Sequence, residues 1–192
     1  MSNKVLIIKT GNTIPSLRAE NEDFEDWFIR GTGLDSNRFV CCAVDKGESL
    51  PVIDDVAAAI VTGSPAHVTD LAPWNEIAAV YLRLLHEQQN PILGVCYGHQ
   101  LLAWAFGGVV GFHPKGREIG TIDVELTREA ASDLLFDKRP KNSAHRLHIS
   151  SQSFLCRMRQ CFSQRIALMH IMHSAWVHRL GGYSFILNLA RM

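Results

Sequence analysis

The sequence predicts an α/β fold over residues 1–137, with a mostly parallel central sheet between layers of helices. Short, continuous apolar runs recur along this part of the chain, as in parallel strands that are buried on both faces. Segments with apolar residues at helical spacing separate these runs. Such alternation implies right-handed crossovers between parallel strands, and it places sites at the carboxyl ends of the strands.

Four strands and three helices account for this pattern. Residues 5–8, 38–44, 57–62 and 91–95 are the apolar runs expected to form strands. The first helix is expected from Leu17 to Phe28, with acidic residues on its outer face, ending near residues 31–33. The second helix is expected over 74–89, and the third over 98–106. Apolar residues at helical spacing mark the second: Ile77, Val80, Tyr81, Leu84 and Leu85.

The composition is that of a soluble globular protein, with 47% hydrophobic and 20% charged residues among 192. No apolar run approaches the roughly 18 residues of a membrane span. The apolar run near the N-terminus is too short for the core of a signal peptide. Five cysteines, an odd number with one adjacent pair, form no dense disulfide framework. We therefore expect a cytoplasmic protein with no membrane partner.

The zero net charge hides two different parts of the chain. All 19 acidic residues lie at or before Asp137, together with ten of the 19 Lys and Arg residues. The stretch 138–192 holds the other nine and no carboxylate side chain. We therefore treat 1–137 as one domain and 138–192 as a basic tail with a separate origin.

The most informative site is a cysteine between a predicted strand and a predicted helix. Gly94 and Gly98 flank Cys96 at two positions on each side. This pattern is typical of a nucleophile elbow, a sharp turn that exposes a reactive side chain. The N-terminus of the following helix would favour the thiolate and, through the N–H of Tyr97, stabilise an oxyanion. From spacing alone, a buried and inert strand cysteine explains the pattern equally well.

Residues 92–103, Ile-Leu-Gly-Val-Cys-Tyr-Gly-His-Gln-Leu-Leu-Ala, closely resemble the nucleophile motif of class I (triad) glutamine amidotransferases. The resemblance continues in order over residues 4–137. Gly63-Ser64-Pro65 resembles the family's Gly-Gly-Pro oxyanion loop, and Pro73-Trp74, Gly107-Gly108 and the segment 116–120 are similar to stand-alone, GMP-synthetase-like members.

The resemblance implies a flavodoxin-like three-layer sandwich and hydrolysis of the side-chain amide of glutamine. Cys96 would be the nucleophile, and the N–H groups of Ser64 and Tyr97 would form the oxyanion hole. Gly63 and Gln100 match positions that contact the glutamine substrate. For His99, packing is favoured over catalysis. The family resemblance implies glutamine as substrate, a synthetase or other ammonia acceptor as partner, and no cofactor or metal.

The tail departs from the family. The family's catalytic histidine and orienting glutamate occur in a C-terminal Gly-x-Gln-x-His-Pro-Glu motif, which is absent here. Without a base to activate the cysteine, we expect this chain to be inactive or severely impaired. The closing strands that carry the motif are expected to be lost or non-native.

A change of reading frame would explain the tail. If residues 181–188 were encoded by GGG GGG TAC AGT TTC ATC CTG AAT, codons chosen for this comparison, the neighbouring frame of that string would encode Gly-Val-Gln-Phe-His-Pro-Glu. This is the missing motif at its expected position. We therefore hypothesise that the chain leaves the family's frame between about Asp137 and His148.

Other functions remain open at this point. The tail charges are too scattered among apolar residues for a nucleic-acid-binding arm, and its His and Cys spacings match no standard zinc site. A non-catalytic amidotransferase-like binding module would keep the pocket without turnover. A γ-glutamyl peptidase-type cysteine hydrolase would instead recruit one of the tail histidines: His145, His148, His170, His173 or His178.

Overall fold

The computed structural model describes residues 4–20 and 22–112, together with the backbone of five short strands after residue 112. In chain order the strands of the first part are β1 (Lys4–Lys9), β2 (Phe39–Ala43), β3 (Val56–Val61), β4 (Ile92–Val95) and β5 (Val109–Phe112). The α-helices are α1 (Pro15–Ala19), α2 (Phe24–Thr32), α3 (Pro73–Glu87) and α4 (Tyr97–Ala105). Short 3-10 helices occupy Ser36–Arg38, Val44–Lys46, Ile53–Asp55 and Val68–Asp70.

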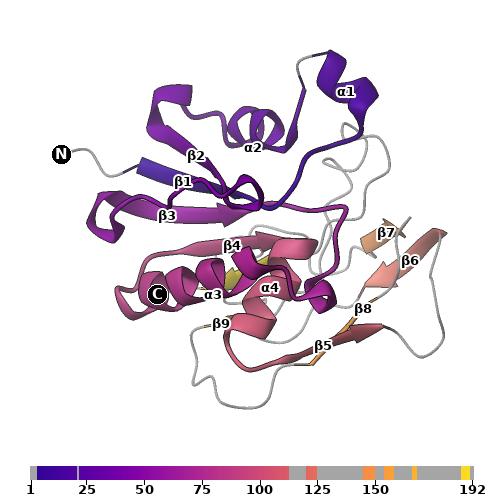
Figure 1. Ribbon diagram of the computed structural model, residues 1–192. Helices are drawn as coiled ribbons and strands as arrows, with labels where there is room; N and C mark the ends of the chain where they lie inside the picture. The colour runs from indigo at the N-terminus through magenta and orange to yellow at the C-terminus, as the bar shows by residue number, and fades with distance from the viewer. Residues whose placement is uncertain are drawn as a thin grey trace.

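The central sheet has the strand order β2-β1-β3-β4-β10-β9, and its first four strands are parallel. This order is typical of a doubly wound fold: β2 lies on one side of β1, and the later strands β3 and β4 are added on its other side. Helix α2 covers one face of the sheet, while α3 and α4 lie on the other (Figure 1). The mostly parallel sandwich predicted from the sequence is confirmed.

Alternating residues of β1 explain why both faces are covered. Leu6 and Ile8 pack into the core beneath α3 and α4, whereas Ile7 packs against Trp27 and its neighbours in α2. All three strand residues are fully buried. An apolar strand of this kind needs a helical layer on each side, because successive side chains point to opposite faces.

The region expected to form one helix from Leu17 to Phe28 contains two helices instead. Asp23 interrupts it: its backbone is extended, and its carboxylate accepts the N–H of Phe24 as the N-cap of α2. Asp26 completes a capping box by accepting the N–H of Asp23. The end of α2 lies where the sequence predicts it, with Gly33 in the left-handed conformation.

Strands also form in the tail, where the backbone of β6 (Gly120–Val124), β7 (His145–Ile149), β8 (Phe154–Arg157), β9 (Ile166–Ala167) and β10 (Leu187–Ala190) is described. Strand β10 pairs antiparallel with β4, and β9 extends the same sheet. Two separate antiparallel pairs, β5 with β8 and β6 with β7, complete the arrangement. Strand β4 is therefore not the edge of the sheet. The expectation that tail strands are lost does not hold for these segments, which form strands. The boundary near Asp137 lies outside the described residues.

Candidate functional site

The predicted nucleophile stands at the junction of β4 and α4. Cys96 has φ 54° and ψ −107°, a positive φ that residues other than glycine rarely adopt. Such a conformation costs about 1–3 kcal/mol and persists only where surrounding contacts hold it. Strain at this one residue, between a buried strand and the first turn of a helix, is the geometry of a nucleophile elbow.

The flanking glycines serve a purpose that the sequence did not reveal. Neither Gly94 nor Gly98 has a positive φ; the positive φ belongs to Cys96 itself. A Cβ at Gly98 would lie 2.4 Å from the carbonyl oxygen of Val61, and one at Gly94 would lie 2.6 Å from the carbonyl oxygen of Gly98. The glycines are required because the helix starts directly against β3 and β4, with no room for a side chain.

The loop after β3 lies beside the cysteine. A Cβ at Gly63 would be 3.7 Å from the Cβ of Cys96 and 3.7 Å from the ring of Phe24. The next residue, Ser64, does not have a positive φ, so a serine fits where the related motif has glycine. The structure thus brings Gly63, Ser64, Cys96 and Tyr97 together at the carboxyl ends of β3 and β4.

The environment of the thiol differs from the sequence expectation. Burial raises the pKa of Cys96 above the ordinary thiol value, and a hydrogen bond from the N–H of Tyr97 lowers it by a smaller amount. The helix N-terminus therefore acts in the predicted direction, but desolvation outweighs it. No charged group in the described part of the chain contributes to this pKa.

The side chain of Tyr97 belongs to the core between the sheet and the helices α3 and α4. It is 1% exposed, and its hydroxyl donates a 2.6 Å hydrogen bond to Oδ1 of Asn75 in α3. Its ring lies 5.4 Å from that of Trp74. Asn75 in turn donates to the carbonyl of Val68. Asn75, which sequence reasoning missed, fixes the first residue of the elbow helix; only contact across two elements reveals it.

The other candidate residues lie on the elbow helix or outside the described region. Gln100 is buried one turn after Cys96, and its N–H donates to the carbonyl of Cys96. His99 is fully buried, which agrees with a packing role. The segment 116–119 and the side chains of all tail histidines and of Cys156 and Cys161 lie outside the described residues.

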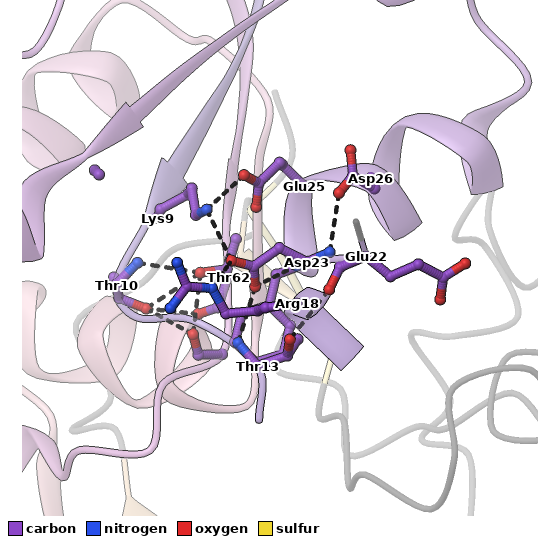
Figure 2. A network of polar contacts seen from close by, with 12 residues as sticks. Lys9, Thr10, Thr13, Arg18, Glu22, Asp23, Glu25, Asp26 and Thr62 are labelled. Carbon is purple, nitrogen blue, oxygen red and sulfur yellow. Dashed lines mark hydrogen bonds and ion pairs between the residues drawn. The ribbon is translucent and has the colours of Figure 1, made fainter. Parts of the chain in front are cut away.

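A second polar network joins the carboxyl end of β1 to α2 and to the loop after β3 (Figure 2). The Asp23 carboxylate accepts the N–H groups of Thr13 and Phe24 and an ion pair from Lys9. Burial, the largest effect, raises the pKa of Asp23, but the two backbone hydrogen bonds and Lys9 together hold it below its usual value. This network fixes the start of α2 and with it Phe24, which contacts the loop beside Cys96.

The described residues contain neither a candidate metal site nor a helix suited to span a membrane. Over residues 4–20 and 22–112, no three His, Cys, Asp or Glu side chains gather as metal ligands would. In the same part, none of the helices has the length and apolar character that crossing a bilayer requires.

Comparison with known families gives one match, to the model described as "Glutamine amidotransferase class-I", over residues 39–174. The match covers more than half of the chain and extends past Asp137.

Curated relatives agree with that family. The chain is 32% identical over 124 residues to "Glutamine amidotransferase-like protein chry6" of Gibberella zeae, covering 62% of this chain and 50% of that protein. It is 38% identical over 99 residues to "GMP synthase [glutamine-hydrolyzing]" of Aeropyrum pernix, covering 51% of this chain and 18% of that protein. The chain therefore spans about half or less of these relatives.

Solved structures share the fold. A glutamine amidotransferase from Thermotoga maritima superposes with a TM-score of 0.63 at 20% identity, covering 88% of this chain and 66% of that one. Another from Methylobacillus flagellatus gives 0.63 at 22% identity, covering 83% and 59%. These likenesses support the three-layer sandwich.

Proposed function

Because this chain belongs to the class-I glutamine amidotransferase family, we propose that its fold is that of a glutaminase and that this particular chain is impaired in turnover. The proposed reaction hydrolyses the side-chain amide of glutamine to glutamate and ammonia. The proposed nucleophile is Cys96. The ammonia acceptor would be a synthetase or another partner, as the names of the longer relatives suggest.

The residues around the elbow have defined roles in this proposal. The Cys96 thiolate attacks the amide carbon, and the N–H groups of Ser64 and Tyr97 stabilise the resulting oxyanion. The C–N bond then breaks, and the nitrogen takes up a proton to leave as ammonia. Water hydrolyses the thioester, which returns the thiol and gives glutamate. Gly63 and Gln100 would line the substrate site.

One observation carries the proposal. Cys96 holds a positive φ of 54° at the carboxyl end of β4, directly against the loop that contains Gly63 and Ser64. An inert structural cysteine would not require this conformation, because ordinary strand ends accommodate cysteine without strain. The strained elbow therefore favours a reactive residue over a merely buried one.

Two observations support impairment. Burial raises the pKa of Cys96, and no charged group in the described part of the chain offsets that shift. In addition, the sequence has no carboxylate after Asp137, so the family's orienting glutamate has no counterpart. A thiol without a base loses orders of magnitude in rate, although oxyanion stabilisation alone can leave about 10³-fold over water.

The frame hypothesis gains support from strand pairing. Strand β10 places Leu187 opposite Val95, the residue that precedes Cys96. In that codon string, the glutamate codon of the recovered motif spans the codons of Leu187 and Asn188, and the histidine codon spans those of Phe185 and Ile186. A frame-restored chain would therefore carry its triad partners at the strand end next to the nucleophile.

The test compares this chain with a frame-restored version made by correcting the gene between the codons of Asp137 and His148. We expect no glutamine-dependent ammonia release from this chain, clear release from the restored one, and loss of that release when Cys96→Ser is added. A glutamine-mimicking diazoketone should label Cys96 in the restored protein, as read by peptide mass. Turnover by the unmodified chain at the restored rate would contradict impairment. Codons incompatible with the shifted motif would contradict the frame change.

The raised thiol pKa also favours a second function, a non-catalytic module that binds glutamine or a partner through the same pocket. Calorimetric titration separates the two. Glutamine binding to this chain, with no ammonia release even in the restored protein, would favour the module. Hydrolysis of γ-glutamyl peptides in preference to glutamine would favour the peptidase alternative.

A further inference from the structure

Two buried threonines lie directly beneath the loop proposed to hold the oxyanion. Thr10 follows β1, and Thr62 follows β3. Their exposures are 1% and 0%, although threonine is usually an exposed residue. We propose that Thr10 and Thr62 form a threonine clamp, a pair of positioning residues that orients the peptide between Gly63 and Ser64. This inference rests on the proposed function of that loop.

The hydrogen bonds of the clamp converge on two carbonyl groups (Figure 2). The Thr62 hydroxyl donates to the carbonyl oxygen of Gly63 at 3.0 Å and accepts the N–H of Thr10 at 3.1 Å. The oxygen of the Thr10 hydroxyl lies 3.0 Å from the carbonyl oxygen of Thr62 and 3.1 Å from that of Gly63, and its single proton serves these two acceptors. Both hydroxyls therefore lie within hydrogen-bonding distance of the Gly63 carbonyl, on the same side of it.

Holding that carbonyl also fixes the N–H of Ser64. A peptide group is planar, and in the trans form its C=O and N–H point in opposite directions. No cis peptide occurs in the described part of the chain. With the oxygen of Gly63 directed at the clamp, the N–H of Ser64 must point to the opposite side of the loop. Within the described residues, this N–H donates to no acceptor of the chain. It is thus free to serve a ligand.

The clamp also connects the loop with the nucleophile. The carbonyl of Thr62 accepts the N–H of Gly98, in the first turn of the elbow helix, at 3.1 Å. The N–H of Thr62 donates to the carbonyl of Ile8 at 3.0 Å. Thr62 therefore links β1, the Gly63–Ser64 peptide and the helix that starts at Cys96. A shift of this residue would move both proposed oxyanion donors relative to the sulfur.

Close packing leaves the loop little freedom to adopt another arrangement. A Cβ at Gly11 would lie 2.8 Å from Cδ of Pro65 and 2.9 Å from Oγ of Ser64. The loop after β1 therefore presses against the loop after β3 with no side chain between them. Since buried hydroxyls are costly without partners, a role in packing alone would be filled at least as well by valine, which has nearly the same shape.

The test uses Thr62→Val and Thr10→Val, each with its serine variant as the control that keeps the hydroxyl. Two reagents are compared at Cys96 by peptide mass at alkaline pH. A glutamine-mimicking diazoketone has a carbonyl that needs the oxyanion donors, and iodoacetamide does not. For Thr62→Val we expect the maximal rate of inactivation by the diazoketone to fall about tenfold or more, given that loss of a donor costs about 10²–10³. The iodoacetamide rate should change less than about twofold, and the serine variants should recover the diazoketone rate.

Equal losses with both reagents, or no loss with either, would overturn the clamp. If the diazoketone does not label even the frame-restored protein, the proposed function fails. If it leaves only the unmodified chain unlabelled, that agrees with impairment, and in both cases amide hydrogen exchange measured by NMR still decides the clamp. We then expect exchange at Gly98, whose N–H donates to the carbonyl of Thr62, to accelerate at least about tenfold in Thr62→Val but not in Thr62→Ser. Unchanged exchange would overturn the inference. If Thr62→Val does not fold, Thr10→Val supplies the same comparison.

Discussion

At the scale of single residues, Cys96 combines two features that oppose one another. Its backbone holds a strained conformation typical of reactive nucleophiles, while desolvation raises the pKa of its half-buried thiol. In the family, a histidine in the C-terminal motif acts as the base that activates the cysteine. The sequence of this chain lacks that motif. The described residues thus place the proposed nucleophile in a strained conformation, with no charged group that lowers its pKa.

This opposition predicts the pH dependence of Cys96 alkylation. The thiolate is the reactive form, so a raised pKa shifts reactivity to higher pH. We expect the pH at which iodoacetamide labels Cys96 at half its maximal rate to lie above 9.0, the ordinary pKa of a thiol. Peptide mass spectrometry would measure the rate at Cys96, with free glutathione as the reference thiol. A half-maximal rate below about pH 7 would instead reveal a histidine or another cation paired with the sulfur.

At the scale of elements, the β4–α4 junction depends on the absence of side chains. Gly94 and Gly98 stand where a strand, a helix and β3 meet at backbone contact distance. Sequence spacing identified these two glycines, but it assigned them a role in bending the chain. Only the packing of three elements shows that they are needed for close approach.

Alanine substitution tests this account of the elbow. In Gly98→Ala the new Cβ would meet the backbone of Val61 at 2.4 Å, so β3 or α4 must shift. We expect the free energy of unfolding to fall by about 1–3 kcal/mol, as for other overpacked sites. Gly111→Ala is the control, because nothing lies within 4 Å of its Cβ position. Urea unfolding measures both variants, and equal stability of the two would contradict the proposed contact.

Helix α3 shows how far a periodic pattern can predict burial. Its position follows from the sequence, but its apolar residues form two stripes. Tyr81 and Leu85 are buried, whereas Ile77, Val80 and Leu84 are 63%, 43% and 44% exposed. Small residues such as Ala78 complete the buried stripe. Apolar spacing cannot decide which stripe faces the sheet, since that depends on how the helix is rotated in the fold.

At the scale of the whole molecule, two tyrosines in different elements link stability to alkaline pH. Burial raises the pKa of Tyr81 to about 12, and repulsion from Cys42 adds to the shift. Burial also raises the pKa of Tyr97. Both phenols therefore stay protonated in the folded chain at pH values where an unfolded tyrosine ionises.

The sign of the effect follows from linkage. Between pH 10.0, the ordinary tyrosine value, and about 12, the unfolded chain loses protons that the folded chain keeps. We expect the free energy of unfolding to fall as pH rises through this range, with tyrosinate absorbance appearing together with unfolding. Tyr81→Phe should reduce the slope of stability against pH. An early tyrosinate signal from Tyr81 in the folded chain would contradict this assignment.

The sequence by itself determined the α/β class, the strand–helix order and the family, because buried parallel strands and the motif around Cys96 leave local signals. It also located the Gly63–Ser64 loop. It did not place the break at Asp23, whose carboxylate caps α2 locally and is also bound by Lys9 and Thr13, two residues that only the folded chain brings to it.

Only the tertiary structure decided how the site is held. The clamp of Thr10 and Thr62 joins residues 52 positions apart, and Asn75 holds Tyr97 across 22 positions. The direction of the Cys96 pKa was decided in the same way, because desolvation comes from the surrounding elements and exceeds the effect of the helix N-terminus. Contacts between distant segments exist only once the chain has folded, so a local pattern can single out Cys96 as a candidate nucleophile but cannot show its surroundings.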